Sequence, residues 1–344
     1  MSTETSTGAA AGPRGKRVRV TAVVEETADA RSFVVEPVGE PAFGYRAGQF
    51  LTVRVPDAGT GSARCYSLSS SPHCDEAMKF TVKRVPGGHG SNWLCDTVTA
   101  GAELDVLPPA GTFTPASLDR SVVLLAGGSG ITPVLAIAKS ILFGGSGEVV
   151  LLYANRDEAS VIFAAELAAL ESKFPDRFTV LHLLESLQGY PSRNLLTVLL
   201  RPFADREVYL CGPEPLMELA AEVCASVGTA GVHSERFLSL QQDPFAAAES
   251  GTGEVACTVR VSLDGEDRVV PWETGQKLLD ALLAAGVDAP YSCREGACSA
   301  CVCALTEGKV ALAHNEILTE DDLAEGYVLA CQAEPVSDEI AIEY

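Results

Sequence analysis

The chain has 344 residues, enough for two or three domains, and its hydrophobic content of 47% is that of a globular protein. Its net charge of −21 argues against nucleic-acid binding, and no run approaches the ~18 apolar residues that predict a membrane span. The eleven cysteines follow no secretory leader, so we expect a cytoplasmic protein whose thiols serve clusters rather than disulfides.

The first 15 residues are rich in Ser, Thr, Gly and Ala and predict a disordered tail. Residues 16–118 follow, with short segments that alternate polar and apolar residues or are rich in β-branched ones, separated by Pro and Gly. The clearest of these segments are 18–24, 49–55 and 78–84. Regular short strands of this kind predict a small antiparallel β-barrel.

Residues 119–237 alternate between strand and helix patterns. The elements that these patterns predict are strands at 122–126, 149–153, 179–183 and 208–211, and helices at 133–142, 160–173 and 215–226. The alternation predicts a doubly wound α/β domain around a parallel sheet, whose ligands bind at the carboxyl edge of the strands.

Residues 238–253 lack a sustained apolar period and predict a linker. Residues 254–344 open with a hairpin, because two strand-like segments flank Asp264-Gly265, a strong signal for a two-residue turn. A helical segment, 277–285, then precedes a cysteine-rich loop. From residue 240 onward the chain carries 20 acidic and 5 basic residues, so this part holds most of the excess negative charge.

The sequence R-C-Y-S-L begins at Arg64 and suits a flavin. Arg64 can pair with a phosphate, Tyr66 can stack or hydrogen-bond, and Ser67 can approach the ring edge. Downstream, G-G-H-G-S-N runs into a helix start, where backbone N–H groups around Gly90 and Ser91 can face a diphosphate. Each motif is too short to identify a flavin site by itself.

A second glycine-rich turn, G-G-S-G-I-T-P, follows the strand predicted at 122–126 and ends at Pro133, which suits a helix start. It differs from the Rossmann G-x-G-x-x-G sequence, because proline stands where the last glycine would be. The tripeptide C-G-P at Cys211 ends another strand about eighty residues later. We therefore expect both turns at the carboxyl edge of the sheet, although a glycine-rich turn alone is also compatible with no ligand.

Four cysteines near the end of the chain are its most informative residues. Cys293, Cys298 and Cys301 have the C-x4-C-x2-C spacing of a plant-type [2Fe–2S] ferredoxin, whose fourth thiolate comes from a distant segment, here Cys331. The small residues between them let backbone N–H groups point at the sulfurs. Zinc and disulfides are the alternatives, but zinc sites usually have two C-x2-C pairs and this segment has one.

In this order and spacing, R-x-Y-S, G-G-S-G-I-T-P and C-G-P resemble the ferredoxin–NADP reductase superfamily. With the C-terminal cysteines, the chain resembles the hybrid reductases that feed bacterial oxygenases, over nearly its whole length after Arg14. The resemblance implies an antiparallel β-barrel flavin domain, a doubly wound α/β nucleotide-binding domain and an α+β ferredoxin domain of the β-grasp type. The candidate residues, from the motifs and the resemblance together, are Arg64, Tyr66, Ser67, Gly90 and Ser91 for FAD, Gly128, Gly130, Thr132, Cys211 and Gly212 for the nicotinamide, Phe237 beside the flavin, and Cys293, Cys298, Cys301 and Cys331 for the [2Fe–2S] cluster.

The resemblance implies a relay in which NADH gives a hydride to FAD and the flavin passes single electrons to the cluster. Ser67, Thr132 and Cys211 would form the hydride pocket. Since the cofactors carry the chemistry, we expect no acid–base residue, and the five histidines are not candidates. Arg156 and Asp157 lie side by side after the second α/β strand, where an Arg favours NADPH and an acid favours NADH. The resemblance favours NADH.

Further segments, among them R-C-Y-S-L and the sequence leading to Cys293, resemble the reductase components of actinobacterial 3-ketosteroid 9α-hydroxylases. That resemblance implies a terminal Rieske non-haem iron oxygenase as partner, in steroid degradation, with no nucleic-acid or membrane partner. The reductase of phenylacetyl-CoA epoxidase shares the domain order and is an alternative. An alternative of another class is a redox-sensing binding protein, which rapid reduction by NADH would distinguish from the enzyme.

Overall fold

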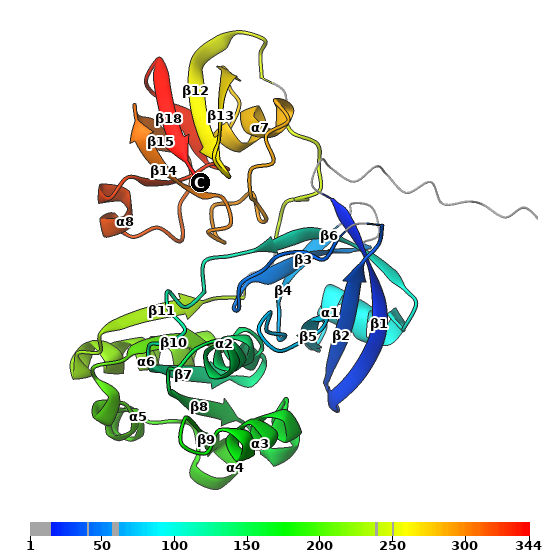
Figure 1. The fold of residues 1–344 in the computed structure, drawn as a ribbon, viewed down its shortest axis with the longest axis vertical. Helices are drawn as coiled ribbons and strands as arrows, with labels where there is room; N and C mark the ends of the chain where they lie inside the picture. The colour runs from blue at the N-terminus through cyan, green and yellow to red at the C-terminus, as the bar shows by residue number, and fades with distance from the viewer. Residues whose placement is uncertain (1–14, 40, 57–61, 238–239, 250) are drawn as a thin grey trace, which may run out of the picture.

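The computed structural model describes residues 15–39, 41–56, 62–237, 240–249 and 251–344. The predicted tail up to residue 14 and residues 238–239 and 250 of the predicted linker lie outside them. Figure 1 shows three sheet-centred parts: the N-terminal strands, the central α/β part and the C-terminal part, which lies beside β3 and β6 of the first. No helix in the described ranges has the length and apolarity needed to cross a bilayer.

The first sheet has six antiparallel strands in the order β4-β3-β6-β1-β2-β5. They are β1 (Lys16–Thr27), β2 (Ala30–Pro37), β3 (Phe50–Val55), β4 (Ser62–Ser67), β5 (Met78–Lys83) and β6 (Glu103–Ala110). A bridge between Leu68 and Phe80 joins the two edges of the sheet. Helix α1 (His89–Thr97) packs against β3, β4 and β5. The sheet therefore closes into the predicted barrel, whose core is formed by alternating inward side chains such as Phe33 and Leu51.

The second sheet has five parallel strands in the order β11-β10-β7-β8-β9. They are β7 (Val122–Gly127), β8 (Val149–Asn155), β9 (Phe178–Leu184), β10 (Glu207–Cys211) and β11 (Gly231–Glu235). Every residue of β7 and β8 is buried, because helices cover both faces of the sheet. The strand order reverses between β7 and β10, so the crevice at their carboxyl ends is where a doubly wound fold binds its ligand.

Helices cover the two faces of this sheet in pairs. Helices α2 (Ile131–Gly144) and α3 (Ala164–Lys173) form one apolar core with the sheet, and α5 (Arg193–Leu200) and α6 (Glu214–Val227) form the other. A short helix, α4 (Glu185–Gln188), follows β9. The doubly wound prediction is thus confirmed, while β11 and α5 are elements that the sequence patterns did not indicate.

The third sheet is mixed, with five strands in the order β13-β12-β18-β14-β16. The elements of this part are β12 (Val255–Leu263), β13 (Glu266–Glu273), α7 (Leu278–Ala284), β14 (Val302–Glu307), β15 (Val310–Leu312), α8 (Glu320–Ala324), β16 (Tyr327–Leu329), β17 (Ala333–Pro335) and β18 (Glu339–Glu343). Asp264 and Gly265 have φ of 55° and 80°, as the predicted hairpin turn requires. Helix α7 buries Leu278 and Leu282 in one core with Trp272, which completes the predicted α+β part.

The described part of the predicted linker is packed rather than free. Leu240 and Phe245 are 7% and 2% exposed and belong to the same apolar core as the third sheet. The Arg54 guanidinium of the barrel lies 4.4 Å from the centre of the Phe245 ring. This segment therefore contacts both the barrel and the C-terminal part, although its sequence has no apolar period.

Candidate active site

Three cavities meet where the three parts come together. The first, about 240 Å³, lies between the barrel and the glycine turn after β7. Its lining includes all five residues predicted for FAD, Arg64, Tyr66, Ser67, Gly90 and Ser91. It also includes Thr132 and Phe237 from the other predicted sets, His89 of the G-G-H-G-S-N segment, and Lys83, which no motif had indicated.

Strand β4 presents the R-C-Y-S residues to this cavity. The Tyr66 ring stacks on Phe80 of the barrel core, with centroids 5.8 Å apart. Burial raises the pKa of Tyr66, so its hydroxyl remains protonated at neutral pH and can donate a hydrogen bond. The Arg64 guanidinium donates to the carbonyl of Ala63 at 2.7 Å, which holds it at the cavity wall.

The glycine-rich segment before α1 forms the opposite wall. No described side chain caps the helix, whose N-cap residue is Gly88, so the N–H groups of its first turn are available to a ligand. A Cβ on Gly90 would lie 3.0 Å from Cγ of Arg64, so glycine allows this turn to approach the arginine. The hydroxyl of Ser91 accepts from the amide of Val85 at 3.0 Å, which fixes the turn.

The second cavity, about 460 Å³, lies at the carboxyl ends of β7 and β10, and its lining includes Gly128 and Gly212, two of the residues predicted for the nicotinamide. The two glycine motifs are packed backbone to backbone. A Cβ on Gly130 would be 2.0 Å from the carbonyl oxygen of Cys211, and one on Gly212 would be 2.9 Å from the amide nitrogen of Gly127. Glycine at these positions is required for close approach of the two turns.

Cys211 is fully buried beneath Gly130, and neither of these two residues is in the lining of this cavity. Burial raises the pKa of its thiol well above the usual 9.0, so it is neutral. Its partner in the sheet register is Glu235 on β11. Burial raises the pKa of that carboxyl to about 8.

The third cavity, about 560 Å³, lies between the barrel, β11 and the cysteine loop. Barrel residues such as Phe50 and Ser67 form one side, and the candidate ligands Cys293 and Cys298 form the other. Phe237, which is 48% exposed, lines all three cavities. It therefore stands where a flavin, a nicotinamide and the cysteine loop would meet.

The cysteine loop has the backbone that its small residues predicted. Arg294, Gly296 and Ser299 have φ of 60°, 79° and 57°, so the chain folds tightly around the thiols. The amide of Glu295 donates to Sγ of Cys293 at 3.3 Å. These conformations direct N–H groups at sulfur, as a cluster loop requires.

The four candidate thiols lie close to one another. The thiols of Cys298 and Cys331 interact with that of Cys293 and lower its pKa, and the Cys331 thiol also interacts with that of Cys301. Within the described ranges, no set of three or more His, Cys, Asp or Glu side chains has the spacing for a single metal ion. Two irons bridged by sulfide need a wider set of four thiolates, and these four cysteines match that donor set.

The cysteine loop is hydrogen-bonded to the barrel on both sides of its first ligands. The Ser292 hydroxyl is 2.6 Å from the hydroxyl of Thr52 on β3 and 3.5 Å from Sγ of Cys65 on β4. The Ser299 hydroxyl is 2.8 Å from that of Thr112. None of these contacts had a sequence signal, because each joins residues more than 180 positions apart.

Arg156 and Asp157, the two residues that bear on the choice between NADH and NADPH, both interact with other residues of the protein. Arg156 pairs with Asp29 of the barrel at 3.2 Å. The Asp157 carboxylate accepts from the amide of Ser160 at 2.9 Å and caps a short 3-10 turn. Arg156 is thus ion-paired within the protein, and Asp157 is engaged in capping the turn.

Models of three protein families match the chain. They are an oxidoreductase FAD-binding domain over residues 17–114, an oxidoreductase NAD-binding domain over residues 124–222 and a 2Fe-2S iron-sulfur cluster binding domain over residues 261–336. Together they define a flavin- and iron–sulfur-containing oxidoreductase.

The chain is 51% identical to the ferredoxin reductase component of 3-ketosteroid-9-alpha-monooxygenase from Rhodococcus rhodochrous, over 96% of this chain and 98% of that one. It is 31% identical to one of the subunits of 1,2-phenylacetyl-CoA epoxidase from Escherichia coli (strain K12), over 94% and 96%. Among solved structures, phthalate dioxygenase reductase is 26% identical with a TM-score of 0.59, over 97% of this chain and 100% of that one.

The chain therefore belongs to the family of monooxygenase ferredoxin reductase components. It is an oxidoreductase that passes electrons from NADH to FAD and from FAD to a [2Fe–2S] cluster. The sequence prediction of a three-domain hybrid reductase with these three cofactors is confirmed.

Proposed function

We propose that the three cavities hold the cofactors in the order of the relay. Domain limits of 16–118, 119–237 and 254–344 fit the three sheets. The proposed assignments are Arg64, Tyr66, Ser67, Gly90 and Ser91 for FAD, Gly128, Gly130, Thr132, Cys211 and Gly212 for the nicotinamide, Phe237 between the two, and Cys293, Cys298, Cys301 and Cys331 for the cluster.

In this proposal each side chain binds or orients, and the cofactors supply hydride and single-electron chemistry. Arg64 and the first turn of α1 hold the diphosphate of FAD, because both present positive charge or N–H donors to one cavity. Ser67 and Thr132 line that cavity from the barrel and from α2. Cys211, being buried, acts through the position of Gly130 rather than by contact.

The observation that carries the proposal is the contact between the flavin-binding strand and the cysteine loop. Cys65 lies beside Tyr66 in β4, and its side chain and that of Cys298 both pack against the apolar group Phe50, Ala110 and Ala300. Electrons that leave the flavin would therefore pass directly from β4 to the cluster.

We propose a Rieske non-haem iron oxygenase as the electron acceptor, and a cytoplasmic setting. The 51% relative is named as part of 3-ketosteroid-9-alpha-monooxygenase, which supports a steroid-hydroxylating oxygenase as the partner system. The acidic excess beyond residue 240 suits docking of the cluster end onto a basic face of that partner. The 31% relative supports the alternative, an epoxidase that acts on a CoA thioester.

A reconstitution tests the proposal. The holoprotein and NADH are mixed with a 3-ketosteroid and the Rieske oxygenase that hydroxylates it, and separately with a phenylacetyl-CoA epoxidase and its substrate. We expect hydroxylated steroid in the first mixture and a turnover that falls as ionic strength rises. Epoxide formed in the second mixture alone would refute the steroid assignment, and turnover independent of salt would refute docking by charge.

A further inference from the structure

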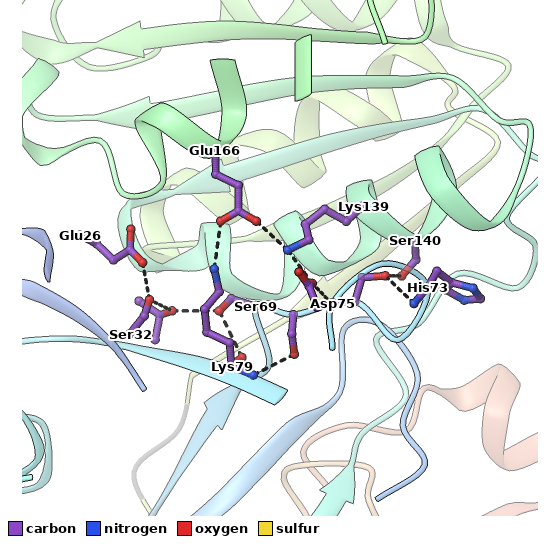
Figure 2. Close-up of polar contacts among 12 residues, drawn as sticks. Glu26, Ser32, Ser69, His73, Asp75, Lys79, Lys139, Ser140 and Glu166 are labelled. Carbon is purple, nitrogen blue, oxygen red and sulfur yellow. Dashed lines mark hydrogen bonds and ion pairs between the residues drawn. The ribbon is translucent and has the colours of Figure 1, made fainter. Parts of the chain in front are cut away.

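Lys139 is a buried lysine in the middle of α2, and its side chain is 3% exposed. Its Nζ lies 2.6 Å from a carboxylate oxygen of Asp75 and 2.6 Å from one of Glu166. The other oxygen of Glu166 accepts a hydrogen bond from Nζ of Lys79 at 2.9 Å. Figure 2 shows these four side chains pointing at one another. We call them the Lys139 network.

The network crosses from the barrel to the α/β part. Asp75 belongs to the connection between β4 and β5, and Lys79 to β5, whereas Lys139 and Glu166 belong to α2 and α3. Next to it, the hydroxyls of Ser71 and Ser140, both fully buried, are 2.6 Å apart. Three polar contacts therefore join the two parts here: Lys139–Asp75 and Lys79–Glu166, which are partly buried, and Ser71–Ser140, which is fully buried.

Helix α2 and strand β5, which carry the two lysines of the network, also line the cavity proposed for FAD. Lys139 follows Thr132 by seven residues, which is two helical turns, about 10 Å along the same face of α2. Lys79 precedes Thr81 and Lys83 by two and four residues, so all three lie on one face of β5. Thr132, Thr81 and Lys83 all line the cavity. The network thus pins together the two surfaces that face each other across it.

Lys139 and Glu166 carry full charges at neutral pH. Burial lowers the pKa of Lys139, but Glu166 and Asp75 outweigh it, so the net pKa lies above 10.5. Burial raises the pKa of Glu166, but Lys139 and Lys79 bring it below 4.5. Two cations and two anions that are partly shielded from water at hydrogen-bond distance fix a geometry more firmly than fully exposed pairs do.

We propose that Lys139 is a positioning residue for hydride transfer, which sets the distance between a nicotinamide on the glycine turn and a flavin in the barrel. The transfer moves two electrons and one proton together from NADH to oxidised FAD, and none of them passes through Lys139. The reacting atoms must approach to about 3–3.5 Å, and a misplacement of about 1 Å costs about a hundredfold in rate. This inference rests on the proposed cofactor positions and adds a residue that touches neither cofactor.

Two variants separate positioning from stability. Lys139→Met removes one cation and leaves two partly buried carboxylates with Lys79 alone, so it also destabilises the fold. Lys139→Met/Asp75→Asn restores the charge balance, because Glu166 then pairs with Lys79, and the Asn oxygen still accepts from the amide of Ser71. The double variant should recover stability without recovering the contact between the two parts.

The measurement is the reduction of FAD by NADH in the holoprotein under single turnover, with the limiting rate and the Kd for NADH determined separately. We expect the limiting rate to fall about a hundredfold in both variants, while the Kd changes less than about threefold. Reduction of the flavin by dithionite, which needs no nicotinamide site, should be unchanged. Lys277→Met, which removes an ion-paired lysine of the C-terminal part, should leave the hydride rate unchanged.

A hydride rate that recovers together with thermal stability in the double variant would overturn the proposal, and so would a wild-type rate in Lys139→Met. The Gly130→Ala variant keeps this result separate from the assignment of the nicotinamide site. If Gly130→Ala slows hydride transfer and Lys139→Met does not, only the positioning role is wrong. If neither variant slows it, the proposed nicotinamide site is wrong.

Discussion

The contact between the two glycine motifs gives a sharp test, Gly130→Ala. Gly130 has φ of −60° and ψ of −11°, a conformation that alanine adopts readily, so the substitution introduces no backbone strain. Its only effect is steric. The new Cβ would lie 2.0 Å from the carbonyl oxygen of Cys211, about 1.4 Å short of the 3.4 Å at which ordinary contact begins. One of the two backbones must therefore move.

The size of the effect follows from that distance. Overpacking of this kind costs about 1–3 kcal/mol. At roughly 2–4 °C for each kcal/mol in a chain of this size, the Tm should fall by about 2–12 °C. A shift of about 1 Å in the turn that begins α2 should slow hydride transfer by about a hundredfold.

Stopped-flow absorbance of the flavin after mixing with NADH and a thermal unfolding curve measure the two effects. Gly44→Ala is the matched control, because Gly44 is exposed and its Cβ would have nothing within 4 Å. We expect the control to reduce its flavin at the wild-type rate. A Gly130→Ala protein with wild-type Tm and wild-type rate would refute the argument that the two motifs are packed backbone to backbone.

Cys298→Ala should lose the cluster absorbance and the bound iron, while NADH still reduces the flavin. Cys303→Ala, at a buried position two residues past a ligand, should keep its iron. Iron analysis and visible spectra measure both outcomes. Ser292→Ala leaves the buried Thr52 hydroxyl without this partner and should weaken loop docking by about 1–3 kcal/mol, so cluster reduction should slow while flavin reduction does not; equal rates for both steps would contradict this. Because its two lysine partners hold the pKa of Glu166 below 4.5 despite burial, its stabilising contribution is present above pH 4.5 and lost as pH falls through the lowered value. The difference in unfolding free energy between wild type and Glu166→Gln should therefore be largest near neutral pH and shrink in acid, and a difference that grows in acid would show the opposite linkage.

Local patterns in the sequence were sufficient for the three-part architecture. Strand alternation predicted the barrel, and the alternation of strands and helices predicted the doubly wound sheet, since both follow from periods of a few residues. Asp264-Gly265 predicted the hairpin, because only certain residues tolerate the left-handed turn that forms. The edge strand β11 escaped prediction, because three of its five side chains are exposed and give no apolar period.

The cofactor set followed from the sequence as well, because each motif is formed within a few residues and the order of the motifs resembles a known superfamily. Cys293, Cys298 and Cys301 need only their own loop to surround a cluster, and the glycine turns need only a strand before and a helix after them. Local spacing therefore indicated the iron–sulfur centre, and the resemblance carried by the order of the motifs implied the flavin and the nicotinamide.

Only the tertiary structure decided how these sites meet. The Gly130–Cys211 packing, the junction at Phe237 and the Thr52–Ser292 contact join segments that are far apart in the chain. Lys139 had no sequence signal at all, because a lysine in a helix is normally a solvated side chain, and its burial depends on carboxylates supplied by two other elements. The sequence determined which cofactors are bound, and the fold determined the distances between them, because such distances arise from contacts that no local pattern encodes.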